Sequence, residues 1–244
     1  AIHIIERAIQ TQHIAHAYLF TGPEGVGKKK AALAMAQYLN CTGKAPESTQ
    51  SCGSCPSCIQ AQTGSQPDII VLEPDGASIK IEQIRALLSK VSLRNYDSVY
   101  KVILINDAHL MTEQAANCLL KTLEEPTDNT VFILITSQIQ NLPITILSRC
   151  QQIQFHTLSP SLIQEILLQH YPAQQSRIGL TAALAGGSMH TAEELLANDD
   201  LAQTRQDFYQ LLAKLDTMRP AQLISWCEQW DKNKKMARTL LELG

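Results

Sequence analysis

The sequence predicts an α/β protein whose strands form a parallel sheet covered by helices on both faces. The first observation behind this prediction is a strand–loop–helix run: apolar residues 17–20, a glycine-rich loop over 21–27 and a helical pattern over 28–39. The second is that further strand-sized apolar runs follow at 67–72, 100–105, 130–135 and 151–155. The third is that helical periodicity fills most of the segments between them, as parallel strands require. A five-stranded parallel sheet is therefore expected.

The helices follow in order along the chain. Residues 1–16 carry apolar side chains at helical spacing and predict a leading helix, beside which His3, His13 and His16 are expected at the surface. The helices predicted between the later strands span 79–91, 113–125 and 143–147. Beyond Phe155 the strands cease. The helices predicted there span 159–170, 174–185 and 191–198, with two or three more within 199–244.

Length and composition narrow the class of protein. The 244 residues are 45% hydrophobic and carry a net charge of −3, which allows one large domain or two to three small ones. No long basic or acidic tract announces a nucleic-acid partner, and no apolar run is long enough to span a membrane. We therefore expect a cytoplasmic protein without a membrane partner. Its seven cysteines favour metal binding or packing over disulfides.

The glycine-rich loop has the spacing of a phosphate-binding loop. Gly22, Gly25 and Gly27 allow backbone N–H groups to turn inward toward a phosphate. Lys28 can reach an outer phosphate of ATP or ADP. The match to G-x-x-x-x-G-K-[ST] fails at Lys29, which stands where the pattern has a hydroxyl that ligates Mg²⁺. The alternative is a glycine-rich turn that holds no ligand.

A second acidic position is expected where the strand at 100–105 ends. A P-loop nucleotide hydrolase needs one carboxylate there for Mg²⁺ and a second acid beside it to orient the attacking water. Asn106 stands at the first position and supplies no charge, whereas Asp107 remains at the second, so Mg²⁺ binding should be weakened. At the end of the next strand, Thr136 either faces the γ-phosphate or simply ends the strand.

Four cysteines form the second candidate site. Cys41 follows the helix at 28–39, and Cys52, Cys55 and Cys58 make two successive C-x2-C steps. Thiolates at this spacing predict a tetrahedral Zn²⁺ site within 41–58, and four of them leave no open position for catalysis. The zinc would be a structural staple inserted into the nucleotide domain. Free or oxidation-prone thiols are the alternative, and an iron–sulfur cluster is a weaker one.

Four features connect the chain to a known family. They are HAYLFTGP at 16–23, the four-cysteine module, LLKTLEEP at 119–126 and TILSRC at 145–150. With them the chain resembles the AAA+ clamp-loader subunits of bacterial DNA polymerase III over essentially residues 1–200. The resemblance implies an AAA+ nucleotide-binding-type domain over 1–156 and a small helical lid domain over 157–198. It also implies that residues 199–244 begin a helical collar domain that is incomplete at the end of this sequence.

The resemblance also implies a role for Arg149 in a neighbouring subunit. In this family the Ser-Arg-Cys string offers an arginine finger, so Arg149 would complete a neighbour's ATP site; an ordinary surface salt bridge is the alternative. An active motor subunit has a hydroxyl at position 29, an aspartate at 106 and an arginine within 187–190. This chain has Lys29, Asn106 and the residues GSMH there. Together the departures resemble a non-hydrolysing, stator-like subunit.

The family further implies the partners. A stator-like subunit holds one position in a hetero-oligomeric ring with delta and gamma/tau subunits, and the ring loads the sliding clamp onto primed DNA. An ATP-hydrolysing motor subunit of gamma/tau type, which manages with Lys29 and Asp107, is the alternative within the family. A zinc-stabilised DNA-binding module is a third hypothesis, which the absence of a basic run disfavours.

Overall fold

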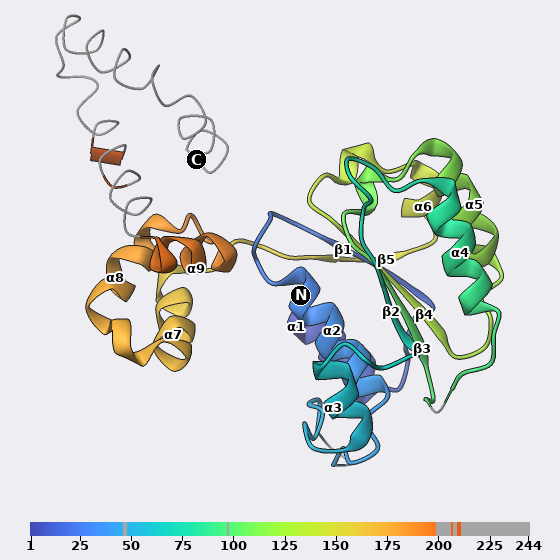
Figure 1. Ribbon diagram of the computed structural model, residues 1–244, viewed down its shortest axis with the longest axis horizontal. Helices are drawn as coiled ribbons and strands as arrows, with labels where there is room; N and C mark the ends of the chain where they lie inside the picture. The colour runs from blue at the N-terminus through green and yellow to red at the C-terminus, as the bar shows by residue number, and fades with distance from the viewer. Residues whose placement is uncertain (46–47, 97, 199–205, 207–208, 211–244) are drawn as a thin grey trace, which may run out of the picture. The chain divides into compact units, whose positions relative to one another are not determined.

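Figure 1 shows the computed structural model of the chain. The structure describes residues 1–45, 48–96, 98–198, 206 and 209–210. The chain divides into two compact units, residues 1–156 and 157–244. Apart from positions 206, 209 and 210, the helices predicted within 199–244 lie outside the described residues. Among the described residues, no helix has the length and apolar character needed to cross a membrane.

The first unit is built on one sheet of five strands in the order β2-β3-β4-β1-β5. The strands are β1 (Ala17–Thr21), β2 (Ile69–Leu72), β3 (Lys101–Ile105), β4 (Thr130–Thr136) and β5 (Gln151–Gln154). Every pairing is parallel, which confirms the predicted five-stranded parallel sheet. Because all strands run in one direction, their carboxyl ends gather at one edge, where open α/β sheets bind ligands.

Helices cover both faces of this sheet (Figure 1). One face carries α1 (Ile2–Gln10) and α2 (Lys28–Leu39), and the other carries α4 (Ile81–Val91), α5 (Glu113–Glu124) and α6 (Ile144–Leu147). Side chains of β1 alternate between the two cores: Leu19 packs with α4 and α5, whereas Tyr18 and Phe20 pack with α1 and α2. Burial of the central strands on both sides explains why they appear in the sequence as continuous apolar runs.

Two predicted helices of the first unit begin or end two or more residues from their predicted bounds. The leading helix ends at Gln10, short of residue 16, and Gln12 then turns the chain toward β1 with a positive φ of 55°. The helix predicted from residue 79 begins at Ile81, because Ile79 pairs instead in an isolated β-bridge. Ile79 therefore ties the loop before α4 to the segment that follows β3.

Three short helices of the first unit were not predicted from the sequence. They are α3 (Pro56–Gln62), the 3-10 helix η1 (Ala108–Leu110) and the 3-10 helix η2 (Ile139–Asn141). None is long enough to display a helical period of apolar residues. The first has local signals nonetheless, because Pro56 occupies its first turn and the Cys55 sulfur caps it by accepting from the N–H of Cys58.

The described part of the second unit is helical, as the sequence predicted. It contains α7 (Pro160–His170), the 3-10 helix η3 (Pro172–Gln174), α8 (Gln175–Leu184) and α9 (Met189–Ala197). Ile163 and Leu167 from α7, Ile178 from α8 and Leu196 from α9 share one apolar core. Ser159 caps α7 by accepting from the N–H of Leu162, so the helix begins where the Ser-Pro pair indicated.

Candidate functional site

The glycine loop joins β1 to α2 at the carboxyl edge of the sheet. Gly27 is the N-cap of α2 and has a φ of 93°, a left-handed conformation that a side chain would strain. Gly22 has a φ of 136°, and a Cβ there would lie 2.2 Å from the carbonyl oxygen of Phe155. The path of the loop therefore requires glycine at both positions. It ends at the first turn of α2, whose N–H groups have no partner within the helix and can bind a phosphate.

Lys28 is folded back onto this loop. Its side chain is almost fully buried, and Nζ donates to the carbonyl oxygens of Gly22 at 2.6 Å and Pro23 at 2.5 Å. Burial lowers the pKa of Lys28, while the charges of Glu24 and Asp107 oppose that shift. The ammonium is thus held by carbonyl oxygens of the glycine loop itself.

Lys29 belongs to a polar network at the same edge. Its Nζ lies 2.6 Å from Oε1 of Glu73. The other oxygen of Glu73, Oε2, accepts from Nδ2 of Asn106 at 3.0 Å, and that Nδ2 also lies 3.1 Å from Oδ2 of Asp107. The structure therefore brings together three predicted positions, 29, 106 and 107, through a residue that was not predicted.

That residue, Glu73, is placed by the register of the sheet. Leu72 of β2 pairs with Ile105 of β3, and the N–H of Asn106 donates to the carbonyl oxygen of Leu72 at 2.9 Å. Glu73 and Asn106 are thus the next residues of two neighbouring strands. An acidic residue directly after an apolar, strand-sized run was the available signal, although the structure leaves this edge strand only partly buried. The sequence does not reveal which strands are neighbours.

Asp107 has an unusual backbone and an unusual ionisation. Its φ of 46° lies in the left-handed region, which Asp tolerates better than most residues. Burial raises the pKa of its carboxyl, and the nearby charges of Glu24 and Glu73 raise it further, whereas His109 and Lys28 lower it. The carboxyl therefore lies among other acids, whose negative charges make its ionisation less favourable.

Thr136 ends β4 beside the glycine loop. It is fully buried, and its Oγ1 lies 3.1 Å from Nδ1 of His109 and accepts from the N–H of Gln138 at 3.0 Å. The next residue, Ser137, donates from Oγ to Oε1 of Glu24 in the loop at 3.2 Å. The end of β4 is therefore connected to the loop, and the buried hydroxyl of Thr136 already has two partners. His109 was not predicted as one of them.

The residues at this edge fit a nucleotide phosphate better than they fit Mg²⁺. The glycine path, the start of α2 and Lys28 make a phosphate cradle. Mg²⁺ requires oxygen ligands, and Lys29 offers an ammonium where a hydroxyl would be needed. Asn106 turns Nδ2, a donor, toward the surrounding carboxylates. Asp107 alone keeps the predicted residue type, and its predicted role is to orient the attacking water rather than to bind the metal.

Arg149 lies after α6 and forms its hydrogen bonds within its own unit. Nε and Nη2 donate to Oε1 of Glu124 at 2.9 and 2.5 Å. Nη1 donates to the carbonyl oxygen of Thr145 at 2.8 Å and to Oγ of Ser148 at 3.1 Å. The side chain remains 32% exposed, so the guanidinium is both oriented and accessible.

The four cysteines converge as predicted. The sulfur atoms of Cys41, Cys52, Cys55 and Cys58 all lie within 4.8 Å of one another. The separations of 3.9 Å between Cys52 and Cys58 and 4.0 Å between Cys41 and Cys55 are far longer than a disulfide bond. They approach the spacing of about 3.8 Å that four sulfurs take around Zn²⁺ at about 2.3 Å. The cluster can therefore hold a tetrahedral zinc ion.

Backbone N–H groups favour thiolates in this cluster. The N–H groups of Cys52, Cys55 and Cys58 lie 3.3, 3.3 and 3.4 Å from the sulfurs of Cys41, Cys52 and Cys55 respectively. Burial raises the pKa of Cys55, but hydrogen bonds from Cys58 and Thr42 outweigh it and bring the pKa to about 5. Burial raises the pKa of the Cys58 thiol to about 12. A bound metal would supply the charge that makes the Cys58 thiolate favourable.

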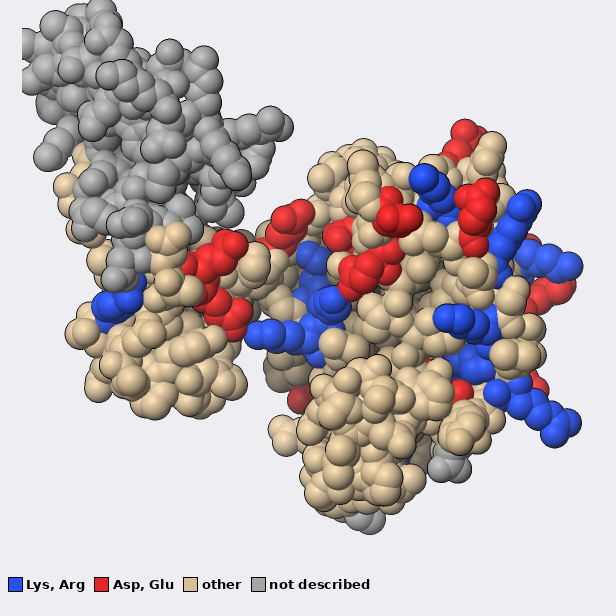
Figure 2. Space-filling view, viewed as in Figure 1, with Lys and Arg blue, Asp and Glu red and all other residues tan. Residues whose placement is uncertain are grey.

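The cysteine module carries little charge. Over residues 41–66 the only charged side chains are those of Lys44 and Glu47. Figure 2 shows the consequence: on the visible face the lobe around α3 is almost entirely free of blue and red, whereas both colours are interspersed over the rest of the sheet unit. Lys44 itself lies over the ring of Tyr38, 4.6 Å from its centroid. The module thus lacks the basic residues that DNA phosphates require.

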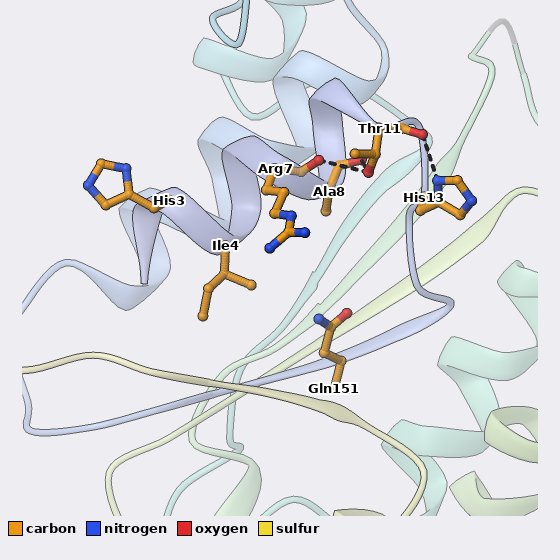
Figure 3. Close-up of a pocket in the computed structure, with 7 residues that line it drawn as sticks. All are labelled: His3, Ile4, Arg7, Ala8, Thr11, His13 and Gln151. Carbon is orange, nitrogen blue, oxygen red and sulfur yellow. Dashed lines mark hydrogen bonds between the residues drawn. The ribbon is translucent and has the colours of Figure 1, made fainter.

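A separate hollow of about 550 Å³ lies between α1 and β5 (Figure 3). It is lined by His3, Ile4, Arg7, Ala8, Thr11, His13 and Gln151. Within it, Thr11 donates to the carbonyl oxygen of Arg7 at 2.8 Å, and Nδ1 of His13 lies 2.6 Å from the carbonyl oxygen of Thr11. None of the predicted site residues lines this hollow. His3, His13 and His16 are exposed, as expected.

Residues 187–190, where α9 begins, include no arginine. Ser188 caps α9, Met189 is buried in the helical core, and Nε2 of His190 lies 3.5 Å from Oε1 of Glu194. Arg177 on α8 is the only lysine or arginine within 157–198, and its Nη2 donates to the carbonyl oxygen of Leu195 at 3.3 Å. The third departure inferred from the sequence is thus a helix start that contains a cap, a core residue and a surface histidine.

The family model and the similar proteins all point to subunits of DNA polymerase III. Residues 1–159 match the family model of the DNA polymerase III delta subunit. The delta-prime subunit of DNA polymerase III from Bacillus subtilis is 36% identical over 229 residues, which cover 93% of this chain and 68% of that protein. The tau subunit of the same organism is 35% identical over 198 residues, 79% of this chain but only 34% of tau. The chain thus spans about two thirds of one relative and about a third of the other.

A solved structure supports the fold. A DNA polymerase III gamma subunit-related protein from Thermotoga maritima superposes with a TM-score of 0.52, covering 75% of this chain and 62% of that one. The identity is 20%, so this likeness speaks for the fold alone. It agrees with the fold class that the sequence motifs predicted.

Proposed function

Because the chain belongs to the DNA polymerase III delta-prime subunit family, we propose that it acts in DNA replication as a non-hydrolysing, stator-like subunit of a clamp loader. The observation that carries the proposal is the Lys29 ammonium, held 2.6 Å from Glu73 at the edge where a hydrolysing site needs a divalent cation. Asn106 removes the carboxylate that would hold that cation. Without Mg²⁺, the β- and γ-phosphate oxygens lose the positive charge that stabilises phosphoryl transfer.

The second part of the proposal is that Arg149 acts on a neighbouring subunit. Its guanidinium is oriented by Glu124 and Thr145 and remains partly exposed. A planar, permanently charged group in this state can reach across an interface to a transferred phosphate. The chain's own site need not hydrolyse ATP for this role.

The partners follow from the family. The curated relatives include the delta-prime and tau subunits of DNA polymerase III, so a hetero-oligomeric ring with gamma/tau and delta subunits is the assembly we propose. In that ring the sliding clamp and primed DNA are contacted by the assembled complex. We further propose an AAA+ domain over 1–156, a helical lid over 157–198 and the start of a collar over 199–244.

Zinc has a structural role in this proposal. Four cysteine sulfurs would complete its coordination sphere and leave no site for water or substrate. The low charge of residues 41–66 argues against a stand-alone DNA-binding module, which is the weakest of the three functions considered.

A motor subunit of gamma/tau type is the second candidate. The 35% identity with tau, the retained Lys28 and the retained Asp107 favour it. It requires ATP turnover by this chain, which a Lys28→Ala variant should abolish. The two candidates therefore differ in whether the purified chain hydrolyses ATP.

The stator proposal is tested in a loader reconstituted with its partner subunits. Arg149→Ala should lower the clamp- and DNA-stimulated ATPase by at least about 100-fold, since arginine fingers contribute roughly 10³-fold or more in related phosphoryl transfers. Arg149→Lys should not restore it, because an ammonium lacks the planar fork. Unchanged turnover in a fully assembled ring would remove this role for Arg149, and ATP turnover by the purified wild-type chain would favour the motor subunit.

A further inference from the structure

Lys29 places a positive charge at the carboxyl edge of the sheet, beside the glycine loop. It replaces the hydroxyl that ligates a metal, and its ammonium contacts Glu73, the carboxylate that also accepts from Asn106. Glu73 therefore links the Lys29 ammonium to Asn106, which occupies the position where a hydrolysing enzyme has its metal-binding acid. Lys29 and Glu73 are each about half exposed, so the pair is open to an incoming ligand.

We propose that Lys29 is a built-in substitute for the divalent cation, so that the glycine loop binds the polyphosphate of metal-free ATP or ADP and Mg²⁺ weakens this binding. The proposal rests on the non-hydrolysing function proposed above and states which form of nucleotide that site takes. In the bound state Lys28 exchanges the carbonyl oxygens of Gly22 and Pro23 for phosphate oxygens, and Lys29 exchanges Glu73 in the same way.

The hydrogen-bond network explains why the metal is excluded. Both oxygens of Glu73 are occupied, one by the Lys29 ammonium and the other by the Asn106 amide. The amide must present its NH₂ group to the carboxylates of Glu73 and Asp107, because its oxygen would be repelled there. A magnesium ion would thus find an ammonium and an amide donor where it needs oxygen ligands.

Charge explains why the metal-free form is preferred. Nucleotide polyphosphate without Mg²⁺ carries two more negative charges than its magnesium complex, and both lysines can pair with them. Mg²⁺ bound to the same phosphates would stand next to the Lys29 ammonium and repel it. The acids at this edge, Glu24, Glu73 and Asp107, oppose phosphate binding, and the positive charge of Lys29 offsets part of that repulsion.

The test is equilibrium binding of ATP and ADP to the purified chain, with a metal chelator in one series and excess Mg²⁺ in the other, and with tripolyphosphate as a base-free probe. Wild-type affinity for ATP should fall at least about threefold when Mg²⁺ is added, because of the lost charge. The double variant Lys29→Thr/Asn106→Asp restores the metal ligands and should reverse the sign, so that Mg²⁺ strengthens binding at least about tenfold. Lys30→Thr removes the same charge one residue further on and should behave as the wild type does.

Three results would overturn the proposal: tighter wild-type binding in Mg²⁺, no wild-type binding of any probe without metal, or the same reversal in Lys30→Thr. Its failure is distinguishable from failure of the stator function. A chain that binds no nucleotide yet loses loader ATPase through Arg149→Ala remains a stator. A chain that hydrolyses ATP by itself contradicts the stator function whatever its metal dependence.

Discussion

Glu124 and Arg149 form an ion pair that joins the two most specific strings of the sequence. Oε1 of Glu124 accepts from Nε of Arg149 at 2.9 Å and from Nη2 at 2.5 Å, although the residues lie 25 positions apart. Glu124 ends α5 in the string LLKTLEEP, and Arg149 follows α6 in the string TILSRC. The proposed finger is therefore oriented by its own subunit before a neighbour's phosphate reaches it.

The first prediction concerns this orientation. Glu124→Ala should lower the ATPase of the reconstituted loader by about three- to tenfold, because an Arg149 held only by Thr145 and Ser148 spends less time in a productive position. Glu124→Gln keeps an oxygen in place of Oε1 and should retain most of the activity. The stability of the isolated chain should change by under about 1 kcal/mol in either variant, as is usual for exposed ion pairs.

The matched control is the neighbouring acid. Glu125→Ala removes the same charge from an exposed position beside Glu124 and should leave the loader ATPase unchanged. If Glu124→Ala and Glu125→Ala lower the activity equally, or if Glu124→Ala has full activity, Glu124 does not position the finger. Urea denaturation of each variant separates a loss of activity from a loss of folding.

The second prediction concerns metal content. The purified chain should carry one zinc ion, and Cys58→Ser should remove it and lower the free energy of unfolding by at least about 2 kcal/mol, because metal binding is coupled to folding. Cys58 is fully buried within the cluster, so its loss cannot be replaced by a water-exposed ligand. Cys118→Ser is the control, since Cys118 lies on α5, outside the cluster. Retention of zinc by Cys58→Ser, or its loss in Cys118→Ser, would contradict the assignment.

The third prediction concerns pH. Burial raises the pKa of Asp107 above the value of 3.8 that it has when unfolded, so the folded state holds this proton more tightly than the unfolded state does. The protonated carboxyl of Asp107 therefore stabilises the folded state. This stabilisation is fully present below the pKa that Asp107 has in the unfolded chain, and it is lost as pH rises through the pKa that it has in the folded protein. Asp107→Asn removes this loss and keeps a side chain that tolerates the left-handed backbone.

The measurement is denaturation of the wild type and Asp107→Asn between pH 4 and pH 7. The free energy of unfolding of the variant should rise relative to that of the wild type as pH increases. The difference should reach only about 0.5 kcal/mol at neutral pH, since solvent screens a partly exposed carboxylate. Parallel curves would mean that Lys28 and His109, which lower the pKa, balance the burial and the nearby acids. Added Mg²⁺ should leave the difference unchanged if the site excludes the metal.

The fold was largely predictable because each central strand carries its own signal. β1, β3 and β4 are buried along their whole length, so they appear as unbroken apolar runs bounded by turns. The leading helix and α3 were harder: the first ends at a local backbone turn at Gln12, and the second is too short for a period. Strand order depends on contacts between distant segments, so the pairing of β2 with β3 was not available from local pattern.

The candidate site divides in the same way. The glycine loop, Lys29, Asn106 and the four cysteines were found because their spacing along the chain carries the chemistry. Glu73 was missed because its role depends on β2 lying beside β3. His109 was missed for a related reason, since its contact with Thr136 spans 27 residues and joins the segments after two different strands. Spacing along the sequence identifies functional groups that lie on one segment. Partners that come from a second strand can be identified only when the order of the strands in the sheet is known.

The fourth prediction tests the path of the glycine loop. Gly22→Ala places a methyl group 2.2 Å from the backbone oxygen of Phe155, which cannot move away as a flexible side chain would. The φ of 136° adds backbone strain at the same residue. The variant should lose at least about 3 kcal/mol of stability, or fail to fold, because the loop must leave the chain that follows β5.

Gly76→Ala is the matched control for this steric argument. Gly76 also has a positive φ, of 68°, but a Cβ there meets no atom within 4 Å. Its cost should therefore be the backbone strain alone, about 1 kcal/mol. Denaturation of both variants measures the difference, and equal losses would mean that strain rather than the contact with Phe155 keeps glycine at position 22. If Gly22→Ala is instead stable, the loop can move away from β5, and the phosphate cradle is more adaptable than its close packing implies.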